Sequence, residues 1–250
     1  EDLELECLHV ILVSRSLPPD EADVDLTRGY QLLQSAHQVV REMSVPMHAQ
    51  IRVAHDVAPT LLEVIKKRHI DMVLLGWRRP TLTPGRVVGN VVDTLLRQAP
   101  CPVIVVKPGQ APAFNRWLLP FAGGPNSRLA LKLMPALMQL GNQPTVHLCA
   151  IAAKHDHQAR RQKQLLRRAG VLEKQLQAPV RTRLVVDENI AGAIVRLGRQ
   201  YHSDVIVLGA SREGLFSHVI KGNIPLEVAQ QSSATILLVQ HNALKNFSAE

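Results

Sequence analysis

The chain of 250 residues is long enough for two domains of ordinary size, each with its own hydrophobic core. Hydrophobic residues make up 46% and charged residues 20%, which is the balance of a globular protein, and no apolar run approaches the roughly 20 residues of a membrane-spanning helix. Aromatic residues are only 3%, so aliphatic side chains must build the cores, as they do in parallel sheets covered by helices.

The net charge of +8 favours anionic partners, a class that includes nucleotides, nucleic acids and anionic membrane surfaces. Nucleic-acid bases stack on aromatic side chains, and the few aromatic residues are not interleaved with the basic ones, so no nucleic-acid partner is predicted. Basic residues crowd the segment 158–176. A solvated helix face is one interpretation of that segment, and attraction to an anionic membrane is the other.

In the first part of the chain, apolar runs predict strands at 8–13, 48–53, 72–75 and 103–106. A helix at 25–43 separates the first two strands, and helices near Ala58 and after Gly89 separate the later ones.

The second part of the chain predicts five strands and four helices in strict alternation. The strands are 117–121, 145–152, 180–186, 205–208 and 235–239, and the helices are 126–139, 158–176, 191–201 and 223–231. Asn126 or Ser127 is expected to cap the first of these helices. Alternating elements with continuous apolar strands predict an α/β fold with a doubly wound parallel sheet.

An internal repeat relates the two parts. Ser203–Gly209 matches Ile70–Gly76 at an offset of 133 residues, and the match continues without a gap to the last strands, 103–106 and 236–239. The sequence therefore predicts two tandem doubly wound domains, at 1–110 and 115–242. Each last strand is apolar and would otherwise be an exposed sheet edge, so we expect the domains to pack through these two strands.

The first copy begins at its second strand, and its opening strand and helix have no counterpart in the chain. The opening strand of a doubly wound sheet is central, so we expect the sheet of the first domain to be interrupted. We interpret the chain as a piece of a longer protein whose upstream residues complete the first domain.

Each fourth strand ends in a glycine and continues into a loop that returns as a helix. Glycine lets the backbone approach a phosphate closely, and a helix N-terminus offers free N–H groups and the positive end of a dipole. The residues predicted to contact a nucleotide on these loops are Gly209, Arg212, Gly222 and Asn223 in the second copy and Gly76, Arg79, Gly89 and Asn90 in the first.

These loops resemble the signature of the universal stress protein family, G-x2-G-x9-G-[ST], in which the loop and the helix start hold ATP phosphates and ribose. The resemblance covers nearly the whole chain. It implies tandem domains with a Rossmann-like fold of the adenine nucleotide α-hydrolase type. Arginine replaces the middle glycine in both copies, at Arg79 and Arg212, and asparagine replaces the final hydroxyl residue.

The loop after strand 117–121 departs further from the family. An aspartate usually stands near the adenosine in this family, and Ala122 occupies its place here. The loop is also distantly similar to the pyrophosphate loop of ATP pyrophosphatases, and a plain strand-to-helix turn is the alternative interpretation. Its position at the topological switch point makes Ala122, Gly123, Gly124 and Asn126 candidate nucleotide contacts.

No metal site is predicted. Cys7, Cys101 and Cys149 share no metal-ligand spacing and lie in or beside apolar runs, as buried reduced thiols of a cytosolic protein do. His155-Asp156-His157 has no evident third ligand, so a solvated loop is the expected structure.

The paired Gly-Asn motifs and the Gly-Gly-Pro-Asn loop are similar to tandem stress domains fused behind membrane transporters, including chloride channels and amino-acid permeases. This resemblance implies a cytoplasmic regulatory tail that is tethered to a membrane transporter and forms homo-oligomers. Three functions stay open: a module that senses ATP or AMP in the second domain, a dimerisation module with a degenerate pocket, and an ATP-hydrolysing enzyme. The enzyme is the least favoured, because no acid, base or metal constellation is visible.

Overall fold

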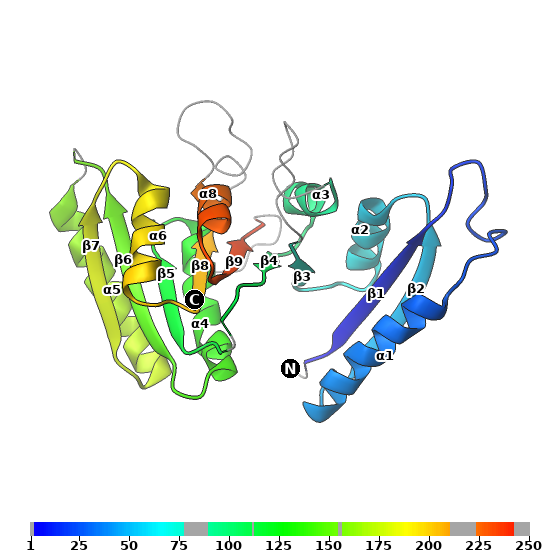
Figure 1. The fold of residues 1–250 in the computed structure, drawn as a ribbon, viewed down its shortest axis with the longest axis horizontal. Helices are drawn as coiled ribbons and strands as arrows, with labels where there is room; N and C mark the ends of the chain where they lie inside the picture. The colour runs from blue at the N-terminus through cyan, green and yellow to red at the C-terminus, as the bar shows by residue number, and fades with distance from the viewer. Residues whose placement is uncertain (1–2, 78–89, 112, 155–156, 211–223, 243–250) are drawn as a thin grey trace. The chain divides into compact units, whose positions relative to one another are not determined.

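The computed structural model describes residues 3–77, 90–111, 113–154, 157–210 and 224–242 (Figure 1). The chain forms two compact units, which comprise residues 1–69 and 70–250. The division falls inside the first sequence repeat. The predicted domain limits, 1–110 and 115–242, follow the repeat and stay predictions.

The first unit is a two-stranded parallel sheet with two helices. Its elements are β1 (Leu5–Leu12), α1 (Thr27–Glu42), β2 (Met47–Ala54) and α2 (Val57–Lys67). The strands pair in register from Leu5 opposite Met47 to Leu12 opposite Ala54. Helix α1 contacts both strands, and a Cβ at Gly29 would lie 2.9 Å from Cδ1 of Ile51, so this glycine lets the helix approach the sheet closely.

The second unit is built on a seven-stranded sheet in the order β3-β4-β9-β8-β5-β6-β7. Its strands are β3 (Val73–Gly76), β4 (Val103–Lys107), β5 (Arg116–Pro120), β6 (Thr145–Ala152), β7 (Val180–Val186), β8 (Val205–Gly209) and β9 (Thr235–Gln240). Its helices are α3 (Asn90–Gln98), α4 (Pro125–Leu137), α5 (Gln158–Leu176), α6 (Ile190–Gln200) and α8 (Ile224–Gln231), with a short 3-10 turn at Met138–Leu140.

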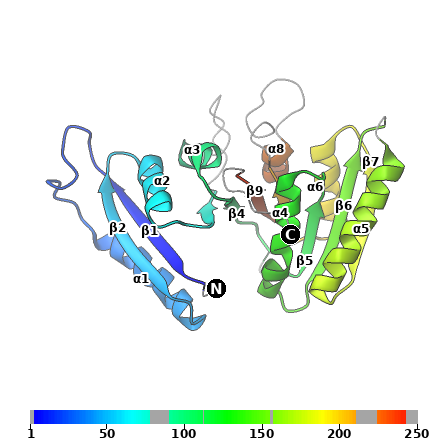
Figure 2. The same cartoon turned by 180° about the vertical axis from the view of Figure 1, so that it is seen from behind.

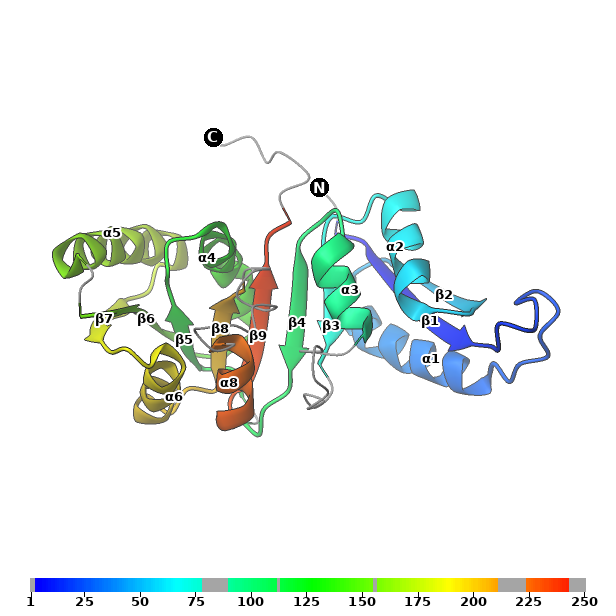
Figure 3. The same cartoon turned by 90° about the horizontal axis from the view of Figure 1, so that it is seen from above.

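The second repeat has the predicted doubly wound topology. Its five strands run in the order β7-β6-β5-β8-β9 and all pair in parallel, which places the opening strand β5 at the centre. Helices α4 and α5 lie on one side of this sheet and α6 and α8 on the other (Figure 3). Figure 2 shows the α4–α5 side from the front. The core between that side and the sheet includes the fully buried residues Trp117, Leu119, Met134, Leu148 and Leu165.

The last strands of the two repeats pair, as predicted from their apolar sequences. Strand β4 runs antiparallel to β9, with Val105 opposite Leu238 and Val103 opposite Gln240. The side chains of Val103, Val105 and Leu238 are fully buried. Each repeat therefore covers the sheet edge of the other, which leaves no exposed apolar strand at this seam.

Side-chain hydrogen bonds from the end of β9 reinforce the seam. Nε2 of Gln240 donates to the carbonyl oxygen of Leu96 at 2.5 Å, and Nδ2 of Asn242 donates to the carbonyl oxygen of Ala99 at 2.7 Å. Both amides are buried, so their hydrogen bonds satisfy carbonyl groups at the end of α3 that water does not reach.

The predicted interruption of the first repeat's sheet is confirmed. Strands β1 and β2 form one sheet, whereas β3 and β4 belong to the other, and no ladder joins the two pairs within the described residues. Strand β3 is consequently an edge strand of the seven-stranded sheet.

The predicted cap of the helix after β5 is wrong. Helix α4 begins at Pro125, and its N-cap is Gly124, whereas Asn126 and Ser127 lie inside the first turn. Proline is favoured at the first helical position because its missing N–H would have no partner there and its fixed φ suits a helix. The proline thus moves the start of the helix ahead of both predicted capping residues.

Candidate functional site

The carboxyl ends of β5 and β8 form the topological switch point of the second repeat. The two strands are neighbours and pair in parallel, with Trp117 opposite Val205 and Leu118 opposite Ile206. From β5 the chain passes to β6 on one side, and β8 lies on the other. In open α/β sheets a crevice forms outside the carboxyl ends of the strands at such a point, and ligands bind there.

A glycine loop leads from β5 into α4 at this edge. The backbone N–H of Phe121 still donates to the carbonyl oxygen of Cys149 on β6, and the chain then turns through Ala122 and Gly123. Gly123 has a φ of +86°, which is in the left-handed region that favours glycine. The turn directs the N-terminus of α4, with its unpaired N–H groups and positive dipole end, to the carboxyl edge of the sheet.

Gly209, at the end of β8, lies directly against the start of α4. A Cβ at this position would be 2.6 Å from the backbone nitrogen of Ser127 and 2.8 Å from the carbonyl carbon of Asn126. Both are backbone atoms, so no flexible side chain can move aside. The glycine is therefore required for the close packing of β8 on α4, a role that its place in the motif did not reveal.

Two polar side chains at the start of α4 form hydrogen bonds with other segments of the chain. Oδ1 of Asn126 accepts a hydrogen bond of 2.7 Å from the backbone N–H of His241, just beyond β9. Oγ of Ser127 accepts one of 3.3 Å from the backbone N–H of Ala122. Asn126 thus fastens α4 to the end of β9, and Ser127 fastens it to the glycine loop. Sequence spacing gave no signal for the partner at His241.

The structure brings five of the predicted nucleotide contacts together at this edge. Ala122 is exposed, whereas Gly123, Gly124, Asn126 and Gly209 are half-buried around the start of α4. Their role toward a nucleotide stays a prediction.

The other predicted contacts are distributed as follows. In the first repeat, Gly76 ends β3, and a Cβ there would meet no atom within 4 Å. Asn90 is the first residue of α3. Arg79, Gly89, Arg212, Gly222 and Asn223 lie outside the described residues.

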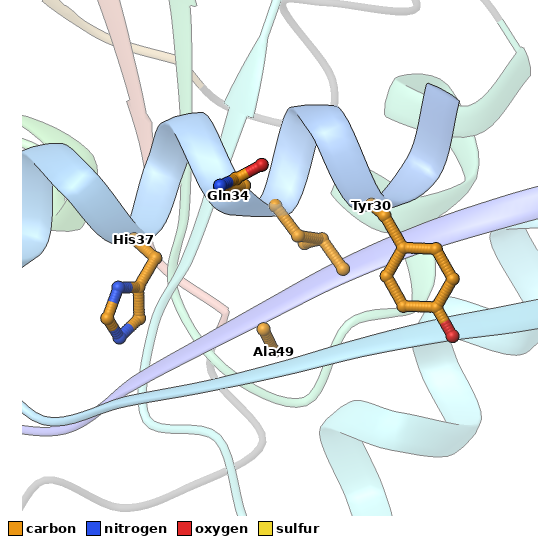
Figure 4. A pocket seen from close by; sticks show the side chains of 5 residues that line it. Tyr30, Gln34, His37 and Ala49 are labelled. Carbon is orange, nitrogen blue, oxygen red and sulfur yellow. The ribbon is translucent and has the colours of Figure 1, made fainter. Parts of the chain in front are cut away.

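The first unit carries a hollow of about 340 Å³ that none of the predicted contacts lines. Tyr30, Gln34 and His37 of α1 and Ala49 of β2 surround it, together with Leu33 (Figure 4). None of these five side chains carries a permanent charge. The glycine loop of the second repeat offers backbone N–H groups and a helix dipole, which suit an anion better than this lining does.

A smaller hollow of about 140 Å³ lies between α4 and α5. Three of its seven lining residues, Arg128, Lys132 and Arg168, are basic. The basic residues Arg160 and Lys163 of α5 are exposed, which agrees with a solvated helix face.

The cysteines and histidines do not form a metal centre in the described part of the chain, where no cluster of three or more His, Cys, Asp or Glu side chains is close enough to hold an ion. The predicted loop at His155-Asp156 lies outside the described residues. Cys101 and Cys149 are buried free thiols, whereas Cys7 is half-buried. Burial raises the pKa of the Cys149 thiol to about 12.

None of the described helices combines the length and the apolar character needed to cross a lipid bilayer.

Comparison with protein families matches the chain to the universal stress protein family over residues 1–107 and 142–240. The two matched segments correspond to the two repeats, and together they cover most of the chain.

Individual relatives agree with this match. Universal stress protein Rv2623 of Mycobacterium tuberculosis is 24% identical over 246 residues, which covers 90% of this chain and 81% of the relative. The Na(+)/H(+) antiporter NhaS5 of Synechocystis is 30% identical over 97 residues, which covers 38% of this chain. The chain spans only 14% of the antiporter's length.

Solved structures show the same fold. A universal stress protein from Archaeoglobus fulgidus superposes with a TM-score of 0.65 at 14% identity, over 97% of this chain and 87% of that one. A putative universal stress protein from Pseudomonas aeruginosa gives a TM-score of 0.60 at 12% identity, over 97% of this chain and 84% of that one.

Proposed function

Because this chain belongs to the universal stress protein family, we propose that it is a tandem regulatory module that binds an adenine nucleotide, ATP or AMP, in its second repeat. The observation that carries the proposal is the geometry at the switch point. The left-handed turn at Gly123 aims the N-terminus of α4 at the edge where β5 and β8 end side by side. Backbone N–H groups in this arrangement suit phosphate oxygens.

The second repeat is the proposed site because it has both sides of the switch point: the end of β5 with the start of α4, and the end of β8. The wall formed by β5 and the start of α4 has no counterpart in the first repeat, which begins at its second strand. Phosphates would lie at Gly222-Asn223, and Arg212 would supply a cation with fork geometry. Ala122 offers no acidic partner to the adenosine, so we expect a dissociation constant no tighter than micromolar.

Calorimetric titration with ATP, ADP and AMP tests the proposal. Gly222→Val should abolish binding because the valine side chain would block the approach of the phosphate. Gly89→Val places the same change at the matching position of the first repeat and should leave binding intact. Arg212→Ala should weaken binding about tenfold or more, since a charged hydrogen bond contributes roughly 1.5–3 kcal/mol. Absence of heat at millimolar nucleotide, or equal binding by Gly222→Val, would refute the sensing function.

A second candidate is a structural module with a degenerate pocket that joins subunits. It is favoured by the use of Asn126 and Gly209 for internal packing at the switch point. The 97-residue match to an antiporter supports attachment of such a module to a membrane transporter. This candidate predicts no nucleotide heat, a stable oligomer in sedimentation experiments, and no turnover of ATP.

A further inference from the structure

The positive charge of the second unit is concentrated in the two helices on one side of its sheet. Helices α4 and α5, which the structure describes in full, contain eight basic residues and a single acidic one. Helices α6 and α8, on the other side of the sheet (Figure 3), contain two basic residues and one acidic residue. The net charge of the whole chain is +8. An excess of positive charge almost as large therefore lies in one helical layer.

Four of these basic residues form a single row along the outer side of α5. Spacings of three, four and seven residues bring Arg160, Lys163, Arg167 and Lys174 to one face of the helix, and all four are exposed. The opposite face includes the fully buried Leu165. At a rise of 1.5 Å per residue the row is about 21 Å long. Helix α5 packs on β6 and β7, at the edge of the sheet farthest from β3, where the chain enters this unit.

The cation row opposes the stability of the helix that carries it. Like charges four residues apart repel each other, as Lys163 and Arg167 do. Where a helix face is only solvated, charges of opposite sign alternate along it, and α2 shows this with Glu63 and Lys67, whose side chains pair at 2.7 Å. The one acidic residue of α5, Glu173, instead accepts a hydrogen bond of 2.9 Å from the first backbone N–H of β7. An anionic partner would therefore offset a repulsion that α5 itself leaves in place.

Two exposed aliphatic side chains flank the cation row. Leu166 follows Lys163 by three residues and Val171 follows Arg167 by four, and their exposed fractions are 51% and 48%. Val171 also lines the hollow between α4 and α5, whose basic residues extend the cationic surface to α4. Helices that lie on a bilayer combine these features, because the cations bind lipid phosphates and the aliphatic side chains enter the boundary of the acyl region.

The composition of the two helices favours a bilayer over a nucleic acid. Neither α4 nor α5 contains a phenylalanine, tyrosine or tryptophan. Single-stranded bases stack on such side chains, whereas lipid phosphates require only cations and an apolar neighbour.

We propose that the α5 surface is a docking surface for a bilayer that contains anionic lipids; we define this surface as Arg160, Lys163, Arg167 and Lys174 with Leu166 and Val171. Each lysine or arginine near an anionic bilayer strengthens binding about fivefold, so the row supports reversible attachment. This inference does not depend on the proposed nucleotide site, because no residue of the α5 surface belongs to the glycine loops.

Sedimentation of the full chain with lipid vesicles tests the proposal. Vesicles of equimolar phosphatidylglycerol and phosphatidylcholine should carry the chain into the pellet, and vesicles of phosphatidylcholine alone should not. Joint replacement of Lys163→Gln and Arg167→Gln should weaken binding roughly thirtyfold, since two charges near the lipid are lost. Val171→Gln should weaken binding severalfold without a change in charge. At about 1 M salt, where the screening length is about 3 Å, binding should fall for every variant.

The matched control removes two exposed arginines from the other side of the same sheet. Arg181 lies opposite His147 in the β6–β7 ladder, and the ring of His147 stacks on Tyr201 at the end of α6. Arg183, two residues further along β7, lies on that same side. Arg181→Gln with Arg183→Gln lowers the net charge by the same amount and should leave vesicle binding unchanged.

Thermal unfolding and nucleotide titration provide the remaining controls. The variant that lacks Lys163 and Arg167 should melt no lower than the unmodified chain, because its loss relieves repulsion, and its titration with ATP should match that of the unmodified chain. Failure of the unmodified chain to sediment with anionic vesicles at low salt would overturn the proposal. Equal losses in the two double variants would overturn it as well, because they would show an effect of net charge alone. Tighter binding of a single-stranded RNA oligonucleotide than of vesicles would assign the row to nucleic acid instead.

Discussion

Replacement of Asp204 by alanine should destabilise the second unit, whereas the same replacement at its repeat equivalent, Asp71, should not. The Asp204 carboxylate is 4% exposed and accepts the backbone N–H groups of Asn115 and Arg116 at 3.0 and 2.9 Å. Alanine leaves both donors without their partner. The same change at Asp71, which is exposed, removes no buried partner and should leave the melting temperature unchanged.

The size of the effect follows from the two backbone donors. A buried donor without a partner costs about 1–3 kcal/mol, and partial access of water to this strand end lowers the sum to roughly 2–4 kcal/mol. The guanidinium of Arg116 returns to solvent and adds little, because half of that side chain is already exposed. In a unit of this size 1 kcal/mol corresponds to about 2–4 °C, so we expect a drop of roughly 4–16 °C.

The pH dependence provides the more specific test. Burial opposes ionisation of Asp204, but hydrogen bonds from Arg116 and Asn115 outweigh it and hold the pKa of this carboxyl below its usual value. A lowered pKa means that the stabilisation is complete above the unfolded-state pKa, near 3.9, and is lost as the pH falls through the folded-state pKa.

Circular dichroism melts at pH 7 and at pH 2–3 measure this difference. The gap between the wild type and Asp204→Ala should be large at pH 7 and should narrow at the acidic pH. A gap that is absent at pH 7, or that is equally large for Asp71→Ala, would refute the role that we assign to the Asp204 carboxylate.

Three further predictions concern packing and reactivity. Gly209→Ala should cost roughly 1–3 kcal/mol of unfolding free energy in urea titrations, because its Cβ meets backbone at 2.6 Å, whereas Gly76→Ala, with no atom within 4 Å, should cost nothing; equal effects would show that β8 does not require the close approach. Val105→Lys should prevent cooperative thermal unfolding because this side chain is fully buried in the β4–β9 seam, whereas Val186→Lys, on the edge strand β7 and 43% exposed, should melt normally. A thiol reagent at pH 8 should modify half-buried Cys7 well before Cys149, whose pKa of about 12 leaves almost no thiolate, and simultaneous modification in the native protein would contradict the burial of Cys149.

The elements of the second repeat could be predicted closely from sequence. The strands 145–152 and 180–186 and the helix 158–176 were expected at the bounds that the structure shows. Continuous apolar runs, which predict strands, alternate there with segments of helical periodicity. Both patterns depend only on residues that are close in sequence. The doubly wound parallel sheet that this alternation predicts is confirmed for the second repeat.

The details that sequence did not reveal depend on contacts between distant residues. The side chain of Asn126 accepts a hydrogen bond from the backbone N–H of His241, and the backbone at the start of α4 leaves no room for a side chain at Gly209. Both contacts join segments that lie far apart in sequence.

The most direct test of a nucleotide site at the switch point is the NMR amide spectrum of the chain during titration with ATP. We expect progressive shifts of the amide signals of Gly123, Gly124 and Asn126, at the loop and the start of α4, and of Gly209 at the end of β8. Signals from Gln34 and His37, which line the hollow of the first unit, should not move. A spectrum unchanged at millimolar ATP, or shifts confined to the hollow of the first unit, would contradict a nucleotide site at the switch point of the second repeat.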